Sequence, residues 1–450
     1  MLLSALYTGQ SLAGFTALLW SSGWNRQQIE AFQTRRLGSL VRHAYHKVPY
    51  YRRLFDQAGL EPDQIRTLGD LHRIPFTSRP DLQALPDKEA MARGFHPGKL
   101  AVHRTSGSSG EPLSIRRTQL EDRLLQAHRL GVLFALGLRI TDRRVAVVTP
   151  RLTHRPLYMK SGILRYEEVH CLWPPERILA KLREYRPDVL RGYPGTLSWL
   201  AGYLTESDRG RIRPRLITTD SEMMTNDMRD CIGSGFRARV IDFYDSHEFN
   251  MIAWECPISG LYHVSDTSVM VEVVRDGQPV GPGEEGELVG TALHSWAMPF
   301  IRFRLGDLVT RGPDGCSCGA PNTTIASIQG RVADRFDLPD GHSVHPYTLV
   351  STLLAGSPWV RRYQIIQEQP DLISVKLAPL AGETPEPEAI AGTQVRLRAK
   401  LGEGVDVRVQ MVTEIPAEPN GKFRPYFSRV SPSERMAVAA SGPFIHPTHG

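Results

Sequence analysis

The feature that most constrains this chain is an alternation of apolar strands and helices over residues 145–244. Short apolar runs predict buried strands at 145–148, 216–219 and 240–244, and a further strand begins at 189–190. Helices are predicted between them, at 175–185 and 226–232. Because consecutive parallel strands need a helical crossover, the alternation predicts an α/β fold of parallel sheets flanked by helices.

Apolar residues recur at helical spacing over 27–60, so a helical stretch is predicted there. Beyond residue 244, the pattern of apolar residues and turns changes twice. Residues from about 256 to 330 turn β-rich, and we expect them to form a subdomain of a large N-terminal domain spanning 1–332. Residues 333–430 combine strand and helix patterns and are expected to form a small, mobile α+β C-terminal domain. The tail at 431–450 is rich in Ser, Pro, Ala and Gly, and disorder is predicted there.

Charge and cysteine content narrow the function classes. Lys and Arg number 54 against 48 Asp and Glu, and a net charge of +6 over 450 residues is weak evidence for nucleic acid, so no nucleic-acid partner is expected. The charge is compatible with an anionic substrate such as ATP or coenzyme A. Five cysteines are too few, and odd in number, for a disulfide framework, which favours a reducing, cytoplasmic compartment.

The first twenty residues are mildly apolar, but Gln10 and Ser11 interrupt the run and no basic leader precedes it. Neither a transmembrane span nor a signal peptide is therefore expected. A helix packed on the protein is the main expectation, and peripheral contact with a membrane surface stays open.

The Ser/Gly-rich loop at 105–112 reads TSGSSGEP. Small residues let backbone amides approach a phosphate chain, and hydroxyls add further donors. No Lys follows the last Gly, so the loop is not a Walker loop. A plain flexible turn is the alternative interpretation.

Two strand ends carry acidic residues with aromatic or basic neighbours. In 242–248, Tyr244 can stack on a base and Glu248 can hold Mg²⁺, a cation that prefers carboxylate oxygen. In 299–307, Asp307 can accept both hydroxyls of a ribose, and Arg304 can neutralise phosphate. An ordinary strand end and an amphipathic strand with solvated charges are the respective alternatives.

Two further motifs lie around and beyond the predicted domain boundary. Gly330-Arg331, followed by Asp334, is expected to act as a hinge, with Arg331 reaching the nucleotide. Lys422, next to Gly421 on a late loop, can swing into a site and pair with developing negative charge. Taken alone, an exposed lysine is more often a solvated charge.

The order of these motifs resembles the adenylate-forming superfamily of acyl-CoA synthetases, peptide-synthetase adenylation domains and luciferases. The chain is most similar to the phenylacetate–CoA ligase/CapK-like branch, through segments 40–51, 74–77, 191–194 and 297–302, and the resemblance spans roughly residues 30–428. It implies that a carboxylic acid and ATP give an acyl-adenylate and pyrophosphate. A small domain then rotates, and a thiol or amine takes the acyl group.

The resemblance implies roles residue by residue. The β- and γ-phosphates are held by Thr105, Ser106, Gly107, Ser108, Ser109 and Gly110. The adenine is flanked by Ser221, Glu222 and Tyr244, and the ribose is bound by Asp307. Glu248 helps to hold Mg²⁺, Arg331 contacts the nucleotide and Asp334 marks the hinge. Lys422 bridges the carboxylate and the α-phosphate in the first half-step.

One departure concerns the tyrosine motif. The family usually has Gly after the tyrosine, whereas this chain has Asp245, which brings an extra negative charge toward the ATP site. Asp tolerates a left-handed backbone better than most residues, so the turn is compatible with it. Tyr193, Trp296 and His247 are candidates for the wall of the acyl pocket.

A zinc site is predicted from Cys256, His263, Cys316 and Cys318. Three thiolates and one imidazole are a common structural zinc set, closed tetrahedrally around the ion. The pattern also resembles a metal-binding insertion of some members of the branch. The alternative is three unrelated thiols and a surface histidine.

The favoured function is an ATP-dependent acid–thiol ligase that forms an acyl-adenylate and then an acyl-CoA, with ATP, Mg²⁺, coenzyme A and structural Zn²⁺ as cofactors. Its partners are a small carboxylic acid and a thiol or amine acceptor. An acid–amine ligase of capsule or secondary-metabolite assembly is the first alternative, and a non-catalytic nucleotide-binding relative is the second. A homodimer also stays open.

Overall fold

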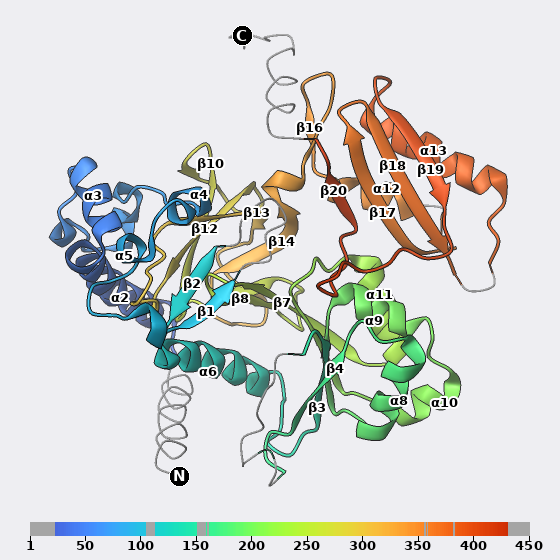
Figure 1. Ribbon diagram of the computed structural model, residues 1–450, viewed down its shortest axis with the longest axis horizontal. Coiled ribbons are helices and arrows are strands. Elements are labelled where there is room, and N and C mark those ends of the chain that lie inside the picture. Colours follow the sequence, from blue (N-terminus) through green and yellow to red (C-terminus); the bar gives the residue numbers. More distant parts are fainter. Residues whose placement is uncertain are drawn as a thin grey trace. The chain divides into compact units, whose positions relative to one another are not determined.

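The computed structural model describes residues 23–104, 113–150, 159, 162–354, 357, 359–380 and 383–430 (Figure 1). The predicted phosphate loop at 105–110, the N-terminal apolar stretch and the 431–450 tail lie outside the described residues. The chain forms two compact units, Met1–Ile140 with Ile241–Ile328, and Thr141–Val240 with Gln329–Gly450. The predicted division at 332/333 is a different one and stays a prediction.

The first unit begins with two helices, α2 (Arg26–Lys47) and α3 (Pro49–Gln57), drawn in blue in Figure 1. The sequence predicts one helical stretch over 27–60, and the break falls at Val48, whose backbone is extended. Pro49 explains the break because the residue before a proline is driven out of the helical region. The buried face of α2, including Leu37, Leu40 and Val41, joins one core cluster of this unit.

The sheet of the first unit runs in the order β11-β10-β12-β13-β14-β9-β8-β7. Its strands are β7 (Arg239–Ser246), β8 (Asn250–Glu255), β9 (Tyr262–Val264), β10 (Val269–Arg275), β11 (Gln278–Pro279), β12 (Glu285–Ala292), β13 (Phe303–Arg311) and β14 (Thr324–Arg331). Antiparallel pairing, as in β10–β12, β12–β13 and β7–β8, agrees with the β-rich character predicted from the turns.

Shorter elements complete the first unit. The hairpin β1 (Ala101–Arg104) and β2 (Ser114–Arg117) brackets the predicted phosphate loop, and α6 (Gln119–Ala135) follows it. Thr118 caps α6 by accepting the amide of Glu121, as its position before an amphipathic run favours. Further short helices are α4 (Arg79–Gln83), α5 (Asp87–Ala90), η1 (Pro62–Gln64), η2 (Leu68–Arg73) and η3 (Pro97–Lys99).

The second unit contains the parallel sheet that the alternating pattern predicts, in the order β6-β5-β3-β4. Its strands are β3 (Arg144–Val148), β4 (Tyr166–His170), β5 (Val189–Gly192) and β6 (Leu216–Thr219). Its helices are α8 (Pro175–Tyr185), α9 (Pro194–Ala201), α10 (Glu206–Arg211) and α11 (Asn226–Phe236). The apolar sides of these elements meet in one core, so the predicted α/β class is confirmed.

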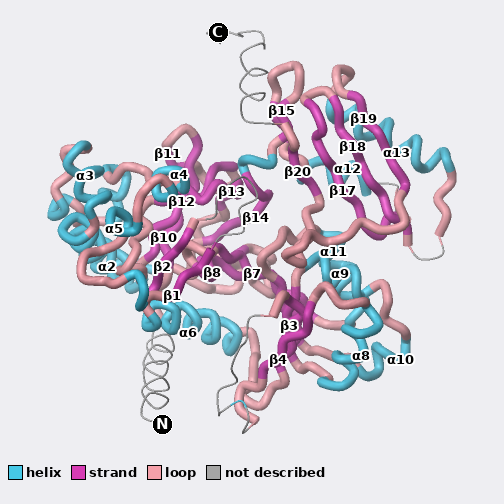
Figure 2. Tube along the Cα trace, viewed as in Figure 1, coloured by secondary structure: helices cyan, strands magenta, loops and turns pink. Residues whose placement is uncertain are grey.

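The C-terminal part of the second unit has its own four-stranded sheet, ordered β19-β18-β17-β20 and drawn in magenta in Figure 2. The strands are β17 (Val360–Gln369), β18 (Leu372–Pro379), β19 (Asp406–Met411) and β20 (Tyr426–Ser428). They pack with α12 (Tyr347–Leu354) and α13 (Pro387–Leu401) around a separate apolar cluster. The short elements η4 (Val332–Asp334), β15 (Phe336–Asp337) and β16 (Ser343–Val344) precede them, and the predicted α+β character is confirmed.

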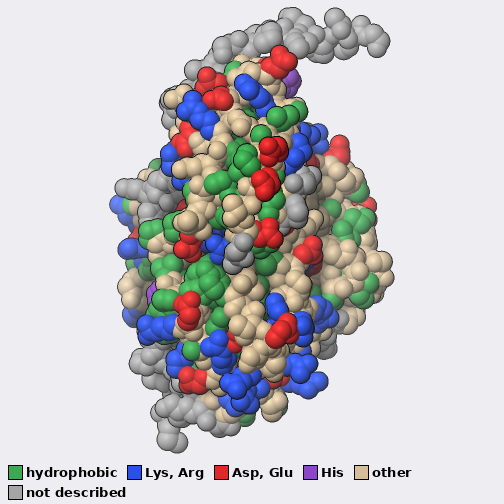
Figure 3. All heavy atoms as spheres, turned by 90° about the vertical axis from the view of Figure 1, so that its right-hand side faces the viewer, with side chains coloured by type: hydrophobic (Ala, Val, Ile, Leu, Met, Phe, Trp, Pro, Cys, Tyr) green, Lys and Arg blue, Asp and Glu red, His purple; other side chains and the backbone are tan. Residues whose placement is uncertain are grey.

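Two surface properties bear on partners. Within the described residues, no helix is both long and apolar enough to cross a membrane. On the face drawn in Figure 3, acidic side chains are interspersed among the basic ones, in keeping with the small net charge.

Candidate functional site

Two predicted nucleotide residues of the first unit, one on β7 and one on β13, contact each other. Tyr244 of β7 donates its hydroxyl hydrogen to Oδ2 of Asp307 on β13, and both side chains are buried. Gly306, immediately before Asp307, has φ +78°, a conformation that glycine adopts without strain. Arg304 of the same strand pairs with Glu287 at 3.5 Å. The proposed adenine and ribose contacts, 63 residues apart in sequence, therefore lie side by side.

Glu248 lies in the turn between β7 and β8 with its side chain only 2% exposed. Its Oε1 accepts a hydrogen bond from Arg79 of α4 at 2.9 Å, which forms an ion pair. Arg117 of β2 donates to the carbonyl oxygens of Glu248 and of His247, so the turn is held by two arginines. The carboxylate is the right kind of ligand for Mg²⁺, and one of its two oxygens, Oε1, is engaged by Arg79.

The extra charge at Asp245 is balanced inside the first unit. Arg129 of α6 forms an ion pair with Asp245, and the two side chains are 18% and 16% exposed. The same guanidinium lies 4.8 Å from the ring centre of Phe243, so it also makes a cation–π contact. The pairing of β7 with β8 shifts register between Tyr244 and Asp245. The sequence prediction named Asp245 but missed Arg129.

The three candidate pocket-wall residues are divided between the two units, and each is described within its own unit. Trp296 of the first unit packs against α2, with its ring 5.1 Å from that of His43 and 5.1 Å from the Arg36 guanidinium. Tyr193 of the second unit is buried immediately before α9. His247 is half-buried.

In the second unit, the strand end after β6 holds a second set of predicted residues. Asp220 is fully buried and forms a bidentate ion pair with Arg191 at 2.6 and 3.0 Å. Ser221 donates to Asp220 at 3.0 Å and has φ +69°, so the chain turns sharply there. Glu222 accepts two backbone hydrogen bonds, from Gly195 at 2.8 Å and from Phe423 at 2.6 Å. The predicted adenine residue Glu222 is thus joined to the loop that carries Lys422.

The predicted hinge residues also lie in the second unit. Gly330 has φ +118°, and a Cβ there would lie 2.7 Å from Cε of Met223, so only glycine fits. The carbonyl oxygen of Arg331 lies 3.3 Å from Nε2 of His345. Asp334 accepts a hydrogen bond at 2.8 Å from Arg424, two residues beyond Lys422.

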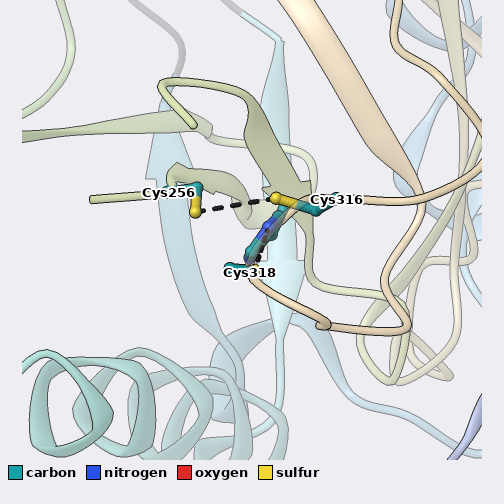
Figure 4. Close-up of side chains that lie close together, drawn as sticks. Cys256, Cys316 and Cys318 are labelled. Atoms are coloured by element: carbon teal, nitrogen blue, oxygen red, sulfur yellow. Dashed lines mark hydrogen bonds between the residues drawn. The ribbon is translucent and has the colours of Figure 1, made fainter. Parts of the chain in front are cut away.

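The four predicted zinc ligands converge in the first unit. Figure 4 shows the three cysteines, whose side chains point toward one another. Cys256 and His263 are buried, whereas Cys316 and Cys318 are half-buried in the loop before β14. All four ligand atoms lie within 4.8 Å of one another. The Sγ atoms of Cys256 and Cys316 are 3.7 Å apart, and Sγ of Cys318 is 3.5 Å from Nε2 of His263.

These distances match a tetrahedral zinc site. Two thiolates at about 2.3 Å from a tetrahedral ion lie about 3.8 Å apart, and a thiolate and an imidazole nitrogen lie about 3.6 Å apart. Two pairs of ligand atoms, contributed by segments more than 50 residues apart, reproduce both separations. The donor set therefore fits Zn²⁺.

Comparison with known proteins supplies the family context. The CapK C-terminal domain model matches residues 338–428. A phenylacetate–coenzyme A ligase of Thermus thermophilus is 28% identical over 365 residues, covering 76% of this chain and 78% of the relative. One of Aromatoleum evansii is 26% identical over 426 residues, covering 86% and 91%.

The fold is shared with a solved ligase. A crystal structure of 2-hydroxyisobutyryl-CoA ligase, in the postadenylation state with R3-HIB-AMP, matches 93% of each chain with a TM-score of 0.75 at 20% identity. The domain match, the curated relatives and this fold together confirm the sequence resemblance: the chain is similar to the adenylate-forming superfamily, in its phenylacetate–CoA ligase/CapK-like branch.

Proposed function

We propose that this protein is an AMP-forming acid–thiol ligase that activates a carboxylic acid with ATP and transfers the acyl group to coenzyme A. The observation that carries the proposal is the Tyr244–Asp307 contact, because it joins two motif residues that the resemblance assigns to one nucleotide. The curated relatives, which are phenylacetate–coenzyme A ligases, support the same reaction.

In the first half-step, a carboxylate oxygen attacks the α-phosphorus of ATP. A new P–O bond forms, the bond to the β-phosphate breaks, and pyrophosphate leaves. Lys422 neutralises the charge that develops between the carboxylate and the α-phosphate, while Asp307 holds the ribose and Tyr244 and Ser221 flank the adenine. The backbone at Glu222 completes the adenine contact, since its carboxylate already accepts two amides.

Magnesium belongs to this half-step. Bound at Glu248, it would supply positive charge to the phosphates, which the loop at 105–110 would cradle with its amides and hydroxyls. The resemblance assigns a further nucleotide contact to Arg331.

In the second half-step, the thiolate sulfur of coenzyme A attacks the acyl carbon of the adenylate. A C–S bond forms, the C–O bond to the phosphate breaks, and AMP leaves. Residues 333–430 act as the mobile domain of this step, and turning about Arg331 and Asp334 requires the Asp334–Arg424 ion pair to adapt.

Zinc has a structural role in this proposal. A closed set of four protein ligands leaves no open position for substrate, so an ion at Cys256, His263, Cys316 and Cys318 would tie together the loops around β9 and β14. Elemental analysis of the purified protein tests this, and a protein without stoichiometric zinc contradicts it.

The deciding experiment measures AMP release and acyl-CoA formation with a panel of carboxylic acids that includes phenylacetate. We expect AMP release that depends on the acid and acyl-CoA that appears only with coenzyme A. Acylation of an added amine, with coenzyme A never acylated, supports the acid–amine ligase instead. Binding of ATP without turnover of any acid supports the non-catalytic relative. A cytoplasmic location and a homodimer stay predictions.

A further inference from the structure

The turn that carries Lys422 is closed by hydrogen bonds between its own residues. The amide of Glu418 donates to the carbonyl of Lys422 at 2.7 Å, and the amide of Gly421 donates to the carbonyl of Glu418 at 2.8 Å. The side chain of Asn420 accepts the amide of Lys422 at 2.8 Å. These hydrogen bonds fix the backbone of the turn. The position of the turn therefore determines the position of the Lys422 backbone.

The turn is seated in a slot formed by Thr149, Cys171, Gly195 and Glu222, which we call the docking slot. Thr149 donates its hydroxyl hydrogen to the carbonyl of Asn420 at 2.9 Å. Gly421 has φ +82°, and a Cβ there would lie 2.3 Å from Sγ of Cys171. The turn therefore fits the slot only with glycine at this position.

Phe423 anchors the other end of the turn. Its side chain is 3% exposed and joins the core of the parallel sheet, and the Arg362 guanidinium lies 3.9 Å from its ring centre. A Cβ on Gly195 would lie 2.7 Å from Cβ of Phe423, so Gly195 permits this close approach.

Glu222 closes the slot with both carboxylate oxygens. Oε2 accepts the amide of Gly195 in the first turn of α9, and Oε1 accepts the amide of Phe423, the residue after Lys422. Amides at a helix start favour a negative partner. One carboxylate thus links the start of a core helix to the backbone that carries the lysine.

Moving a carboxylate out of water costs free energy unless hydrogen bonds and nearby positive charges offset the loss. Desolvation raises the pKa of Glu222 to about 7, although the Gly195 and Phe423 amides and the nearby charges of Arg362 and Lys422 favour the charged form. The ionised carboxylate accepts these two amides more strongly than the neutral acid does. The Glu222 carboxylate keeps its hydrogen bond to Phe423 only while the Lys422 turn occupies the docking slot.

We propose that Glu222 is a positioning residue that holds the Lys422 turn in the docking slot for adenylate formation. The inference rests on the proposed function, in which Lys422 serves the first half-step. In this proposal, Glu222 acts on Lys422 indirectly, by accepting the backbone amide of Phe423. Thr149, Cys171 and Gly195 form the rest of the docking slot. The proposal also predicts that substitutions in the docking slot change the rates of the two half-steps to different extents.

The test compares the half-steps in Glu222→Gln. This variant keeps the side-chain shape but presents an NH₂ group to one of the two amides, which removes a charge-assisted hydrogen bond. We expect acid-dependent ATP–pyrophosphate exchange to fall about 10- to 100-fold in kcat. We expect transfer from supplied acyl-adenylate to coenzyme A to change by less than about threefold, because that step does not use the seated lysine.

Two further variants sharpen the result. Gly421→Ala blocks seating by a clash with Cys171 and leaves Glu222 intact, so it should give the same imbalance between half-steps even if Glu222→Gln folds poorly. Glu184→Gln, an exposed glutamate on α8 of the same unit, is the matched control and should leave both half-steps at the wild-type rate.

Equal loss of both half-steps in Gly421→Ala, or full exchange activity in folded Glu222→Gln, overturns the inference. A wild-type protein that supports no acid-dependent exchange with any acid overturns the proposed function instead. The two failures are therefore distinguishable.

Discussion

Replacing Arg129 with leucine removes one half of the ion pair with Asp245. Both side chains are largely buried, at 18% and 16% exposed, so the Asp245 carboxylate would lose a close cationic neighbour in a poorly hydrated place. The variant also loses the cation–π contact with Phe243 at 4.8 Å. We therefore expect the first unit to be clearly less stable without Arg129.

The magnitude follows from the burial. Removing one partner of a buried ion pair costs about 3–5 kcal/mol, and the partial exposure of this pair places the loss near about 3 kcal/mol. The cation–π contact adds about 0.5–1 kcal/mol. In the double variant Arg129→Leu, Asp245→Gly, the carboxylate that lost its cationic neighbour is also removed, and position 245 carries the glycine that is usual in the resembling family. A coupling of about 2 kcal/mol between the two positions is expected.

Urea unfolding of the wild type, both single variants and the double variant measures this coupling. Arg123→Leu, an arginine on the same helix that contacts Gln119, is a matched control and should lose under about 0.5 kcal/mol. If the double variant loses as much as the two single variants together, Arg129 does not balance Asp245. The charge at Asp245 would then bear on the nucleotide site, and the ATP KM of Asp245→Gly would fall markedly.

Further predictions concern other parts of the molecule. Cys318→Ser should lose stoichiometric zinc and lower the melting temperature, and unchanged zinc content would reject the site. Burial lowers the pKa of His128 to about 3 and of His294 to about 4, so both are neutral when folded. The unfolded chain binds their protons below about pH 6.5, so the urea midpoint should fall as pH drops, and less so in His128→Leu; an equal drop would contradict this. Tyr244→Phe removes the donor to Asp307 and should raise the KM for ATP about 10-fold, measured by AMP release; an unchanged KM would contradict the shared nucleotide contact.

Local patterns predicted the framework well. The parallel strands and α8 follow from apolar periodicity, and the predicted bounds of α8, Pro175–Tyr185, agree with the structure. The convergence of Cys256, His263, Cys316 and Cys318 could be predicted because thiols and imidazole are rare and their metal chemistry is specific. The break between α2 and α3 was missed although Pro49 signalled it.

Long-range charge partners could not be predicted in the same way. Arg129 and Asp245 are 116 residues apart, and Arg79 and Glu248 are 169 apart. Arginines are frequent on solvated surfaces, and neither spacing leaves a local period that would single these two out. Which charged residues become neighbours depends on how the helices pack on the sheets. The ion pair between Arg129 and Asp245 is therefore visible only in the three-dimensional structure.

The central claim, acid activation by ATP, is tested most directly by ATP–pyrophosphate exchange. The assay is run with phenylacetate and other acids on the wild type and on Lys422→Ala, with circular dichroism to confirm that the variant is folded. We expect exchange that depends on the acid in the wild type and is lost in Lys422→Ala. Exchange of undiminished rate in the variant, or none with any acid in the wild type, would contradict the account.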